Sequence, residues 1–325
     1  MYKKKAGGRI PLCRVFAKIS LLGGFAPSAF YYGARCYRMA NERRNNPLVK
    51  PYLKWAGGKR QILPEIREHL PQNFRGLYYH EPFLGAGALF LNQQPRRAVV
   101  NDNNAELVLT YKVIREQVDD LIGVLSVHKE RNNEKYYYEI REQDRDREVF
   151  NKLTDVQKAA RLIYLNKTCF NGLYRVNSQG LFNVPYGKYT NPAICDVPVL
   201  RAIHKYLENA EIEILHGDFA DAVKNAGRKT FIYFDPPYYS PNNTNFTGYL
   251  AGGFGDDEQA RLRDVFVERT DAGAKCLLSN SDTQFIRDLY DDGRFEFFTI
   301  KAKRIINSDS TGRGEVDEIL IKNWR

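Results

Sequence analysis

The 325-residue chain has few cysteines and no long apolar run, and each shortage excludes a class of protein. Its five cysteines are odd in number and include no Cys-x-x-Cys pair, so they predict neither a disulfide framework nor a zinc site. We interpret them as reduced thiols of a cytoplasmic protein. No apolar segment approaches the roughly 20 residues that a membrane-spanning helix needs, so we expect no contact with a membrane.

Acidic residues are fewer than basic residues: the chain has 39 Asp and Glu and 49 Lys and Arg. Ten of these bases and one acid lie in residues 1–46, which leaves 39 bases and 38 acids for the rest of the chain. The net charge of +10 therefore says little about the folded body. Residues 157–206 are different, because they carry seven bases, one acid and many aromatic side chains. That combination is typical of a surface that binds nucleic acid.

The composition of residues 1–46 predicts a basic appendage, and the segment has no sustained hydrophobic periodicity. We expect it to be disordered, or absent from a native product that starts at Met39. A signal peptide is the alternative, but Lys18 interrupts its apolar region and no clear cleavage site follows.

Short apolar strands alternate with helical segments along much of the remaining chain, which predicts an α/β fold with an open, Rossmann-like sheet. The expected strands are residues 77–82, 98–100, 211–215, 230–234 and 275–278, with an antiparallel pair at 295–301 and 316–321. The alternation stops between residues 109 and 207, where the pattern is mostly helical and includes a β-hairpin signal at 173–186. We therefore expect a main domain of residues 47–108 and 208–325 with an inserted domain at 109–207.

Glycines follow the first expected strand, in the segment Glu81–Gly87, and an acidic residue, Asp102, ends the second strand. This arrangement predicts a ligand site in which Phe83, Gly85 and Gly87 approach the ligand and the acid binds ribose hydroxyls. The third glycine of the dinucleotide fingerprint is missing. The pattern therefore favours a nucleoside ligand without a pyrophosphate over NAD.

The strand at 230–234 runs into Asp235, Pro236, Pro237 and Tyr238. Prolines fix φ and remove backbone donors, so carbonyl oxygens are left to accept hydrogen bonds. Asp235 and the Pro236 carbonyl are placed to accept both hydrogens of an exocyclic amine while Tyr238 stacks on the ring. We predict that these four residues are catalytic. The alternative is an ordinary Pro-Pro turn with a solvent-exposed acid.

Four motifs, in this order and spacing, resemble the Dam-type (D12 class) family of DNA adenine-N6 methyltransferases over residues 51–322. They are Leu53–Lys59, Glu81–Gly87, Asn171–Arg175 with Phe182–Tyr189, and Asp235–Tyr238. The resemblance implies a methyltransferase sheet that binds S-adenosylmethionine and an insert that recognises double-stranded DNA. It also implies that the target is the adenine of GATC. We expect a monomer that needs no metal.

The same resemblance implies that Trp55, Lys59, Asp102 and Asp235 contact the methyl donor or close its pocket. Lys59 is either a partner of the donor's carboxylate or a solvated side chain. Asp218, followed by Phe219, is either an acceptor for the donor's adenine amine or a helix N-cap.

For the DNA, the resemblance implies that Leu173, Arg175, Pro185 and Tyr189 face the bases and that Phe170 and Asn171 lie near the point of intercalation. Lys188 is expected to contact a phosphate. Arg313, in the polar loop 306–314, is a further candidate for phosphate binding, unless this is a plain solvent loop. Core packing is the alternative for Phe170 and Tyr189, and a solvated charge is the alternative for Arg175.

A base cannot be methylated inside the helical stack, so the hypothesis requires base flipping. Two other functions stay open from the sequence. One is methylation of RNA or of a glutamine amide, and the other is a DNA-binding module without activity. The sequence also leaves open whether the setting is restriction–modification, a phage or a housekeeping mark.

Overall fold

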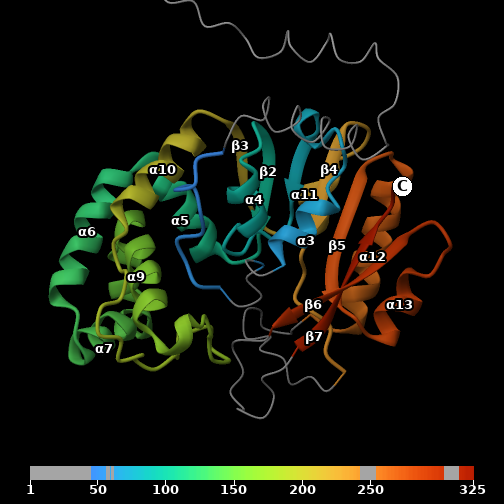
Figure 1. Ribbon diagram of the computed structural model, residues 1–325. Coiled ribbons are helices and arrows are strands. Elements are labelled where there is room, and N and C mark those ends of the chain that lie inside the picture. The colour runs from blue at the N-terminus through green and yellow to red at the C-terminus, as the bar shows by residue number, and fades with distance from the viewer. Residues whose placement is uncertain (1–44, 56–58, 60–61, 242–253, 304–314) are drawn as a thin grey trace, which may run out of the picture. The chain divides into compact units, whose positions relative to one another are not determined.

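The computed structural model describes residues 45–55, 59, 62–241, 254–303 and 315–325 (Figure 1). The predicted appendage of residues 1–46, except for its last two residues, lies outside these ranges. A seven-stranded sheet in the order β3-β2-β1-β4-β5-β7-β6 forms the centre of the described chain. Its strands are β1 (Tyr78–Glu81), β2 (Arg97–Asp102), β3 (Glu211–His216), β4 (Thr230–Phe234), β5 (Lys275–Ser281), β6 (Glu296–Lys303) and β7 (Glu315–Lys322).

Helices connect the strands and cover the sheet. The α-helices are α3 (Leu63–Glu68), α4 (Ala88–Gln93), α5 (Ala105–Glu116), α6 (Val118–Arg131), α7 (Glu134–Glu142), α8 (Arg147–Lys152), α9 (Asp155–Thr168), α10 (Val197–Glu208), α11 (Phe219–Val223), α12 (Asp256–Asp271) and α13 (Gln284–Tyr290). Short 3-10 turns occur at Phe74–Gly76, Gln143–Arg145 and Phe170–Gly172. None of these described helices combines the length and the apolar character that a bilayer crossing requires.

The first five strands of the sheet are parallel, whereas β7 pairs antiparallel with both β5 and β6. The predicted α/β class and the antiparallel closing pair are thereby confirmed. Because β1 lies between β2 and β4, the strand order reverses beside β1. Ligands of open α/β sheets bind at such a reversal, at the carboxyl ends of the strands.

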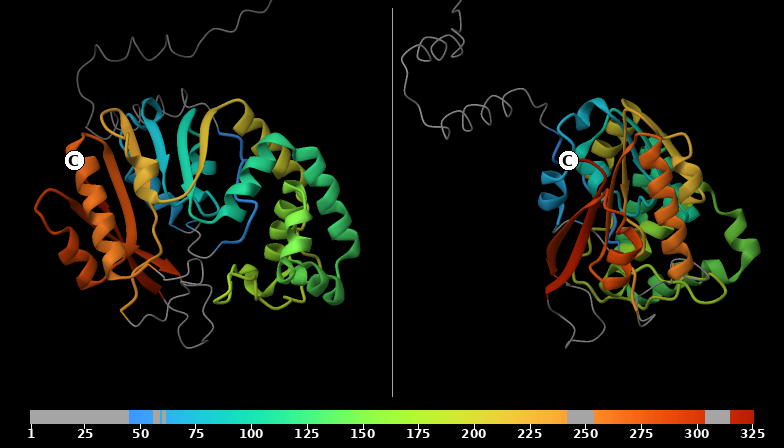
Figure 2. Two further views of the ribbon diagram at one scale, coloured as in Figure 1. Left: turned by 180° about the vertical axis from the view of Figure 1, so that it is seen from behind. Right: turned by 90° about the vertical axis from the view of Figure 1, so that its right-hand side faces the viewer.

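The strand β4 shows how the two faces of the sheet are buried. Its five residues are all buried, and they alternate between two apolar clusters. Phe231 and Tyr233 belong to a cluster that includes residues of α3, α4 and α5, whereas Ile232 and Phe234 pack with α11, α12 and α13. The right-hand view of Figure 2 shows α3 and α12 on opposite sides of the sheet. A fully apolar strand is what a central parallel strand requires.

The helices α6–α10 lie beyond the β3 edge of the sheet, and β6 and β7 form the opposite edge (Figures 1 and 2). The predicted capping box is present at the start of α9, where Thr154 and Gln157 exchange hydrogen bonds. The apolar spacing from residue 107 to residue 125, which predicts helix, is divided between α5 and α6. Gln117, with φ −140° and ψ 43°, ends α5 because its backbone leaves the helical region.

The predicted hairpin forms as a tight loop rather than as a regular ladder. Val176 pairs with Phe182 and Cys169 pairs with Tyr186 as isolated bridges, and Gly180 N–H donates to the Asn177 carbonyl across the turn. The helix α5 continues across residues 108 and 109, the boundary at which we expect the insert to begin. The division into residues 47–108, 109–207 and 208–325 stays a prediction.

Candidate active site

Asp235 lies directly after β4, where the chain leaves the sheet in the segment Asp235–Tyr239, here named the β4 turn. Its Oδ1 accepts hydrogen bonds from Lys59 Nζ at 2.9 Å and from Ser279 Oγ at 2.8 Å. Burial raises the pKa of Asp235 above its usual value, and the Lys59 ammonium and the Ser279 hydroxyl oppose that rise. The structure therefore holds a largely buried carboxylate beside a compensating cation.

The ring of Tyr238 contacts the same cation, the Lys59 ammonium. The Lys59 Nζ is 3.9 Å from the centre of the Tyr238 ring, and the Tyr238 hydroxyl donates to Glu318 Oε2 at 2.8 Å. Burial, together with Asp235 and Glu318, raises the pKa of this phenol well above its usual value, so the phenol stays neutral. Lys59, expected from the sequence to face a donor carboxylate or solvent, contacts Asp235 and Tyr238 in the structure.

The glycine loop between β1 and α4 is shaped by two left-handed residues, Gly85 with φ +50° and Gly87 with φ +65°. A Cβ on Gly85 would lie 3.2 Å from Cδ1 of Trp55, and a Cβ on Gly87 would lie 2.7 Å from the hydroxyl of Tyr111. Glycine is thus required at both positions by conformation and by space. The loop is therefore packed closely against Trp55 and Tyr111, with Gly87 buried and Gly85 partly exposed.

Asp102, at the end of β2, holds the glycine loop in place. Its Oδ2 accepts from Gly85 N–H at 2.8 Å, and its Oδ1 accepts from Asn104 N–H at 2.9 Å. Burial raises the pKa of Asp102, and these two backbone donors oppose the rise. Each carboxylate oxygen can accept a second hydrogen bond, so Asp102 is still able to bind a hydroxyl.

An aromatic cluster adjoins the same edge of the sheet. The ring of Phe83 stacks on Phe219 with centroids 5.1 Å apart, and the ring of Phe254 meets Phe83 edge-on at 5.7 Å. Asp218 caps α11 by accepting from Ala220 N–H, and it also pairs with Arg261, whose guanidinium lies 4.4 Å over Phe219. The predicted alternative of an N-cap is therefore the role visible in the structure.

The ionisation of Asp218 follows from these partners. Burial acts to raise its pKa, but the hydrogen bonds from Arg261 and from Ala220 N–H outweigh burial and bring the pKa below its usual value. Asp218 is consequently an anionic acceptor at neutral pH beside the stacked rings of Phe83, which is half-buried, and Phe219, which is buried. Such a pair suits the amine and the ring of a purine.

Residues near the predicted hairpin are joined to the segment before the glycine loop through Asn166. The Asn166 side chain accepts from Lys54 N–H at 2.8 Å and donates to the carbonyls of Lys54 at 2.6 Å and Gly172 at 3.0 Å. The indole of Trp55 stacks on Tyr174 with centroids 5.1 Å apart. The segment before the glycine loop and the start of the hairpin are thus joined by one buried amide and one aromatic pair.

The predicted DNA-contacting residues differ in their exposure. Phe170 is 50% exposed, which makes it the most exposed large hydrophobic residue of the described chain. Leu173 is buried, with 9% of its surface exposed. Asn171 and Lys188 are exposed and have positive φ values of 55° and 52°. Pro185 is exposed as well.

Two further members of this set are held by neighbours. Arg175 donates from Nε to Asn183 Oδ1 at 2.7 Å, so Asn183 engages one edge of the guanidinium. The ring of Tyr189 lies under Lys54 Nζ at 4.3 Å. Arg313 and the whole of its loop, residues 306–314, lie outside the described residues.

Sequence reasoning missed Ser279, Asn280, Gln259, Glu318 and Asn166. The run Ser279-Asn280-Ser281 at the end of an apolar strand was the available signal for the first two. In the described ranges, no cluster of three or more His, Cys, Asp or Glu side chains is arranged to hold a metal ion.

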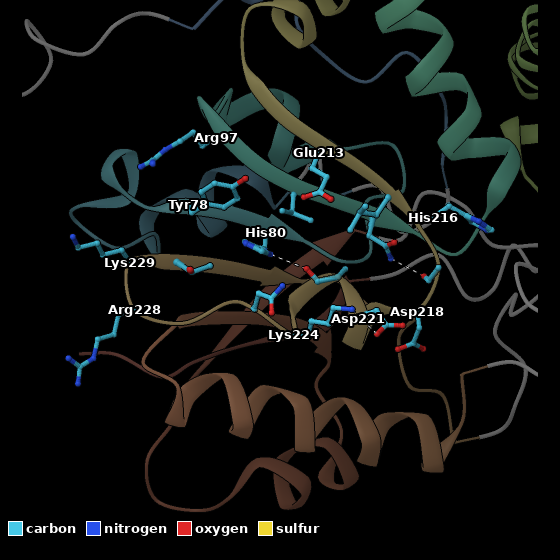
Figure 3. Close-up of a pocket in the computed structure, with 17 residues that line it drawn as sticks. Tyr78, His80, Arg97, Glu213, His216, Asp218, Asp221, Lys224, Arg228 and Lys229 are labelled. Carbon is cyan, nitrogen blue, oxygen red and sulfur yellow. Dashed lines mark hydrogen bonds and ion pairs between the residues drawn. The ribbon is translucent and has the colours of Figure 1, made fainter.

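A separate pocket of about 800 Å³ opens on the face of β1, β2 and β3 beside α11. Figure 3 shows Arg97, Arg228 and Lys229 at one end of it and His216 and Asp218 at the other. The His80 ring lies on its floor, with Nδ1 3.1 Å from the Ala222 carbonyl oxygen. None of the β4 turn residues lines this pocket. The neighbouring helix α11 has only five residues and so covers little of the adjoining sheet face.

Comparison with known proteins agrees with this geometry. Residues 55–306 match the family model described as D12 class N6 adenine-specific DNA methyltransferase. Type II methyltransferase M1.LlaDCHI of Lactococcus lactis subsp. cremoris is 41% identical over 283 residues, covering 87% of this chain and 98% of that protein. Type II methyltransferase M.MjaIII of Methanocaldococcus jannaschii is 40% identical over 85% of this chain and 99% of its own length. The DNA adenine methylase of Escherichia coli K12 is 33% identical over 83% and 94%.

Proposed function

Because the chain belongs to the D12 class of N6 adenine-specific DNA methyltransferases, we propose that it methylates the adenine of duplex GATC. In this proposal S-adenosylmethionine is the methyl donor, and the adenine is flipped out of the helix to reach the site. The observation that carries the proposal is the Asp235 carboxylate, held by Lys59 and Ser279 beside the Pro236 carbonyl.

The residues at the sheet reversal fit S-adenosylmethionine. Gly85, which is only partly buried, lies next to the Trp55 indole, and Asp102 retains capacity to accept from a ribose hydroxyl. Asp218 offers an anionic acceptor for an adenine amine, and the half-buried Phe83 ring, backed by Phe219, offers an aromatic contact. When bound, the donor supplies an electrophilic methyl group.

The β4 turn is proposed to make the adenine N6 more nucleophilic. The lone pair of N6 is delocalised into the purine ring, so the free amine is a poor nucleophile. Asp235 and the Pro236 carbonyl accept the two N6 hydrogens, which draws the nitrogen toward tetrahedral geometry and localises the lone pair. As N6 becomes cationic, the Asp235 carboxylate stabilises the charge, and preorganised electrostatic groups of this kind are effective because they need not reorganise. Tyr238 stacks on the base.

The insert, residues 109–207, is proposed to bind the duplex. Support comes from the excess of positive charge between residues 157 and 206 and from the exposed Phe170 ring, which we propose enters the space between base steps. Asn183 engages the Nε edge of Arg175, so the opposite guanidinium edge is the one offered to guanine. The preference for GATC rests on the resemblance of the motifs to the Dam-type family.

The test uses labelled S-adenosylmethionine with a duplex that holds one GATC and a duplex in which that site is scrambled. We expect methyl incorporation into the first duplex only. Asp235→Ala is expected to lower turnover at least about 10²-fold while DNA binding persists, a loss comparable to that of one preorganised transition-state group. Asp264→Ala is the matched control, because its side chain is 71% exposed and pairs only with Arg263 on the surface.

Equal incorporation into both duplexes would refute the GATC specificity. Full activity of Asp235→Ala would refute the role of the β4 turn. Preferential methylation of RNA in competition with duplex DNA, or of a glutamine-containing peptide, would move the substrate to one of the alternative classes.

A further inference from the structure

The carboxyl end of β5 is polar although it is buried in the middle of the sheet. Ser279 and Asn280 are 0% exposed and Ser281 is 7% exposed. Three consecutive polar side chains in such a place are costly unless each finds a hydrogen-bond partner. All three find partners in the neighbouring β4 turn.

These contacts hold the turn at its beginning and at its end. Ser279 Oγ donates to Asp235 Oδ1 at 2.8 Å, and Ser281 Oγ donates to the Tyr239 carbonyl at 2.7 Å. Asn280 Oδ1 accepts from Tyr239 N–H at 3.0 Å. The end of β5 therefore acts as a template for the residues that follow β4.

A second amide extends the template to the centre of the turn. Gln259, on α12, is 0% exposed, and its Oε1 accepts from Asn280 Nδ2 at 3.0 Å. Its Nε2 donates to the Pro237 carbonyl at 3.0 Å. The orientation of both amides is dictated by the backbone at either end, because the Pro237 oxygen can only accept and the Tyr239 N–H can only donate.

Asn280 and Gln259, whose side chains are hydrogen-bonded to each other, are here named the relay. Its two ends bind the backbone on either side of Tyr238. The peptide group before Tyr238 is held by Gln259, and the peptide group after it is held by Asn280. Together they restrict the backbone from which the Tyr238 ring projects. The relay also engages the Pro237 carbonyl and so restrains the peptide next to the Pro236 carbonyl.

We infer that Gln259 and Asn280 are positioning residues for methyl transfer, which fix Tyr238 and the Pro236 carbonyl in the geometry that the target amine requires. Both act through the β4 turn. The inference rests on the proposed function, since it assigns the relay to the same site. Small errors of position in an active site can cost about 10²-fold in rate.

Two variants test it. Gln259→Met keeps the length of the side chain and removes both hydrogen bonds. Asn280→Asp keeps the acceptor for Tyr239 N–H and removes the donor to Gln259. Gln284→Met is the matched control, because Gln284 is an exposed residue on α13 whose amide contacts only Asp288 one turn along.

The measurement is methyl transfer in a single turnover with excess enzyme, together with donor affinity by calorimetry and DNA affinity by fluorescence anisotropy. With enzyme in saturating excess the rate constant is independent of the folded fraction, and far-UV circular dichroism with denaturant unfolding measures that fraction separately. We expect both relay variants to lower the rate constant at least about 30-fold, with the folded fraction and both dissociation constants within twofold of wild type. The Gln284→Met rate constant should equal that of wild type.

A normal rate constant in Gln259→Met and Asn280→Asp would overturn the inference, and so would a loss confined to the folded fraction, which would mark the relay as merely structural. Failure of the proposed function is distinguishable, because wild type and Gln284→Met would then transfer no methyl group to the GATC duplex.

Discussion

Lys59 and Asp235 form a largely buried ion pair, with Nζ 2.9 Å from Oδ1 and side-chain exposures of 6% and 18%. Buried ion pairs contribute little to stability because desolvation offsets their attraction. The pair is better explained by ionisation, since burial raises the pKa of Asp235 and the ammonium opposes that rise. Lys59 thus favours the charged form of the carboxylate, which is the form that the proposed mechanism needs.

The pH dependence of methyl transfer is expected to follow this carboxylate. Activity is lost as the pH falls through the raised pKa of Asp235, because protonation removes the anion. In Lys59→Met that pKa rises further, so the acid limb of the rate profile moves to higher pH by about 1 unit or more.

Lys224→Met is the control for this prediction, because Lys224 is an exposed base 3.8 Å from Asp221. Single-turnover rates from pH 5 to pH 9 measure the shift. An unmoved acid limb accompanied by weaker donor binding would instead assign Lys59 to the donor's carboxylate.

Gly85→Ala is expected to weaken donor binding more than it weakens folding. A left-handed conformation costs a non-glycine residue roughly 1–2 kcal/mol, and the new Cβ would lie 3.2 Å from the Trp55 indole. Calorimetric titration with S-adenosylmethionine checks the affinity. Gly293→Ala isolates the cost of the positive φ, since a Cβ there meets nothing within 4 Å. Equal donor affinity in both variants would contradict a role for the loop in the donor site.

Phe170→Ala is expected to impair base flipping while leaving the fold intact. The ring is 50% exposed, so its removal changes the free energy of unfolding by no more than about 0.5 kcal/mol. A fluorescent base analogue at the target position reports flipping, and the signal should fall. Val149→Ala, at a side chain that is 45% exposed, is the control. An unchanged flipping signal would leave Phe170 outside the intercalation step.

Asn166→Leu is expected to destabilise the protein by about 3 kcal/mol. The amide is fully buried and makes three hydrogen bonds, so its loss leaves backbone groups of Lys54 and Gly172 without this partner. Denaturant unfolding measures the change. Asn209→Leu, at an exposed residue that ends α10, should cost far less. Similar losses in both variants would refute the bridging role.

The stability of the protein is expected to fall in mild acid because of His80. Burial lowers the pKa of this imidazole to about 4, against an ordinary value near 6.5. Between these values the unfolded chain binds a proton that the native state does not, so stability decreases as the pH falls from 6.5 to 4.

His80→Asn removes this titration and keeps a donor toward the Ala222 carbonyl. The slope of unfolding free energy against pH in that window should therefore be shallower than in wild type. A slope identical to that of wild type would show that other groups account for the acid sensitivity.

Much of the fold could be predicted because the signals are local. The apolar run 230–234 coincides with β4, since a run of buried apolar residues stopped by two prolines admits few other structures. The glycine loop and Asp102 were predicted for the same reason. In contrast, the break between α5 and α6 at Gln117 has no local signal, and the apolar spacing continues across it.

The amino-acid sequence by itself determined the order of strands and helices, the left-handed glycine loop and the rigid segment after β4, because conformational preference and hydrophobic period act over a few residues. Only the tertiary structure decided which distant side chains meet that segment. Three such side chains are Lys59, Gln259 and Ser279, which lie up to 220 positions apart in the sequence. The sequence around them does not indicate that they contact the β4 turn. They become buried only when β4 packs against β5 and α12. Burial then turns their hydrogen bonds into the contacts that hold Asp235 and Tyr238.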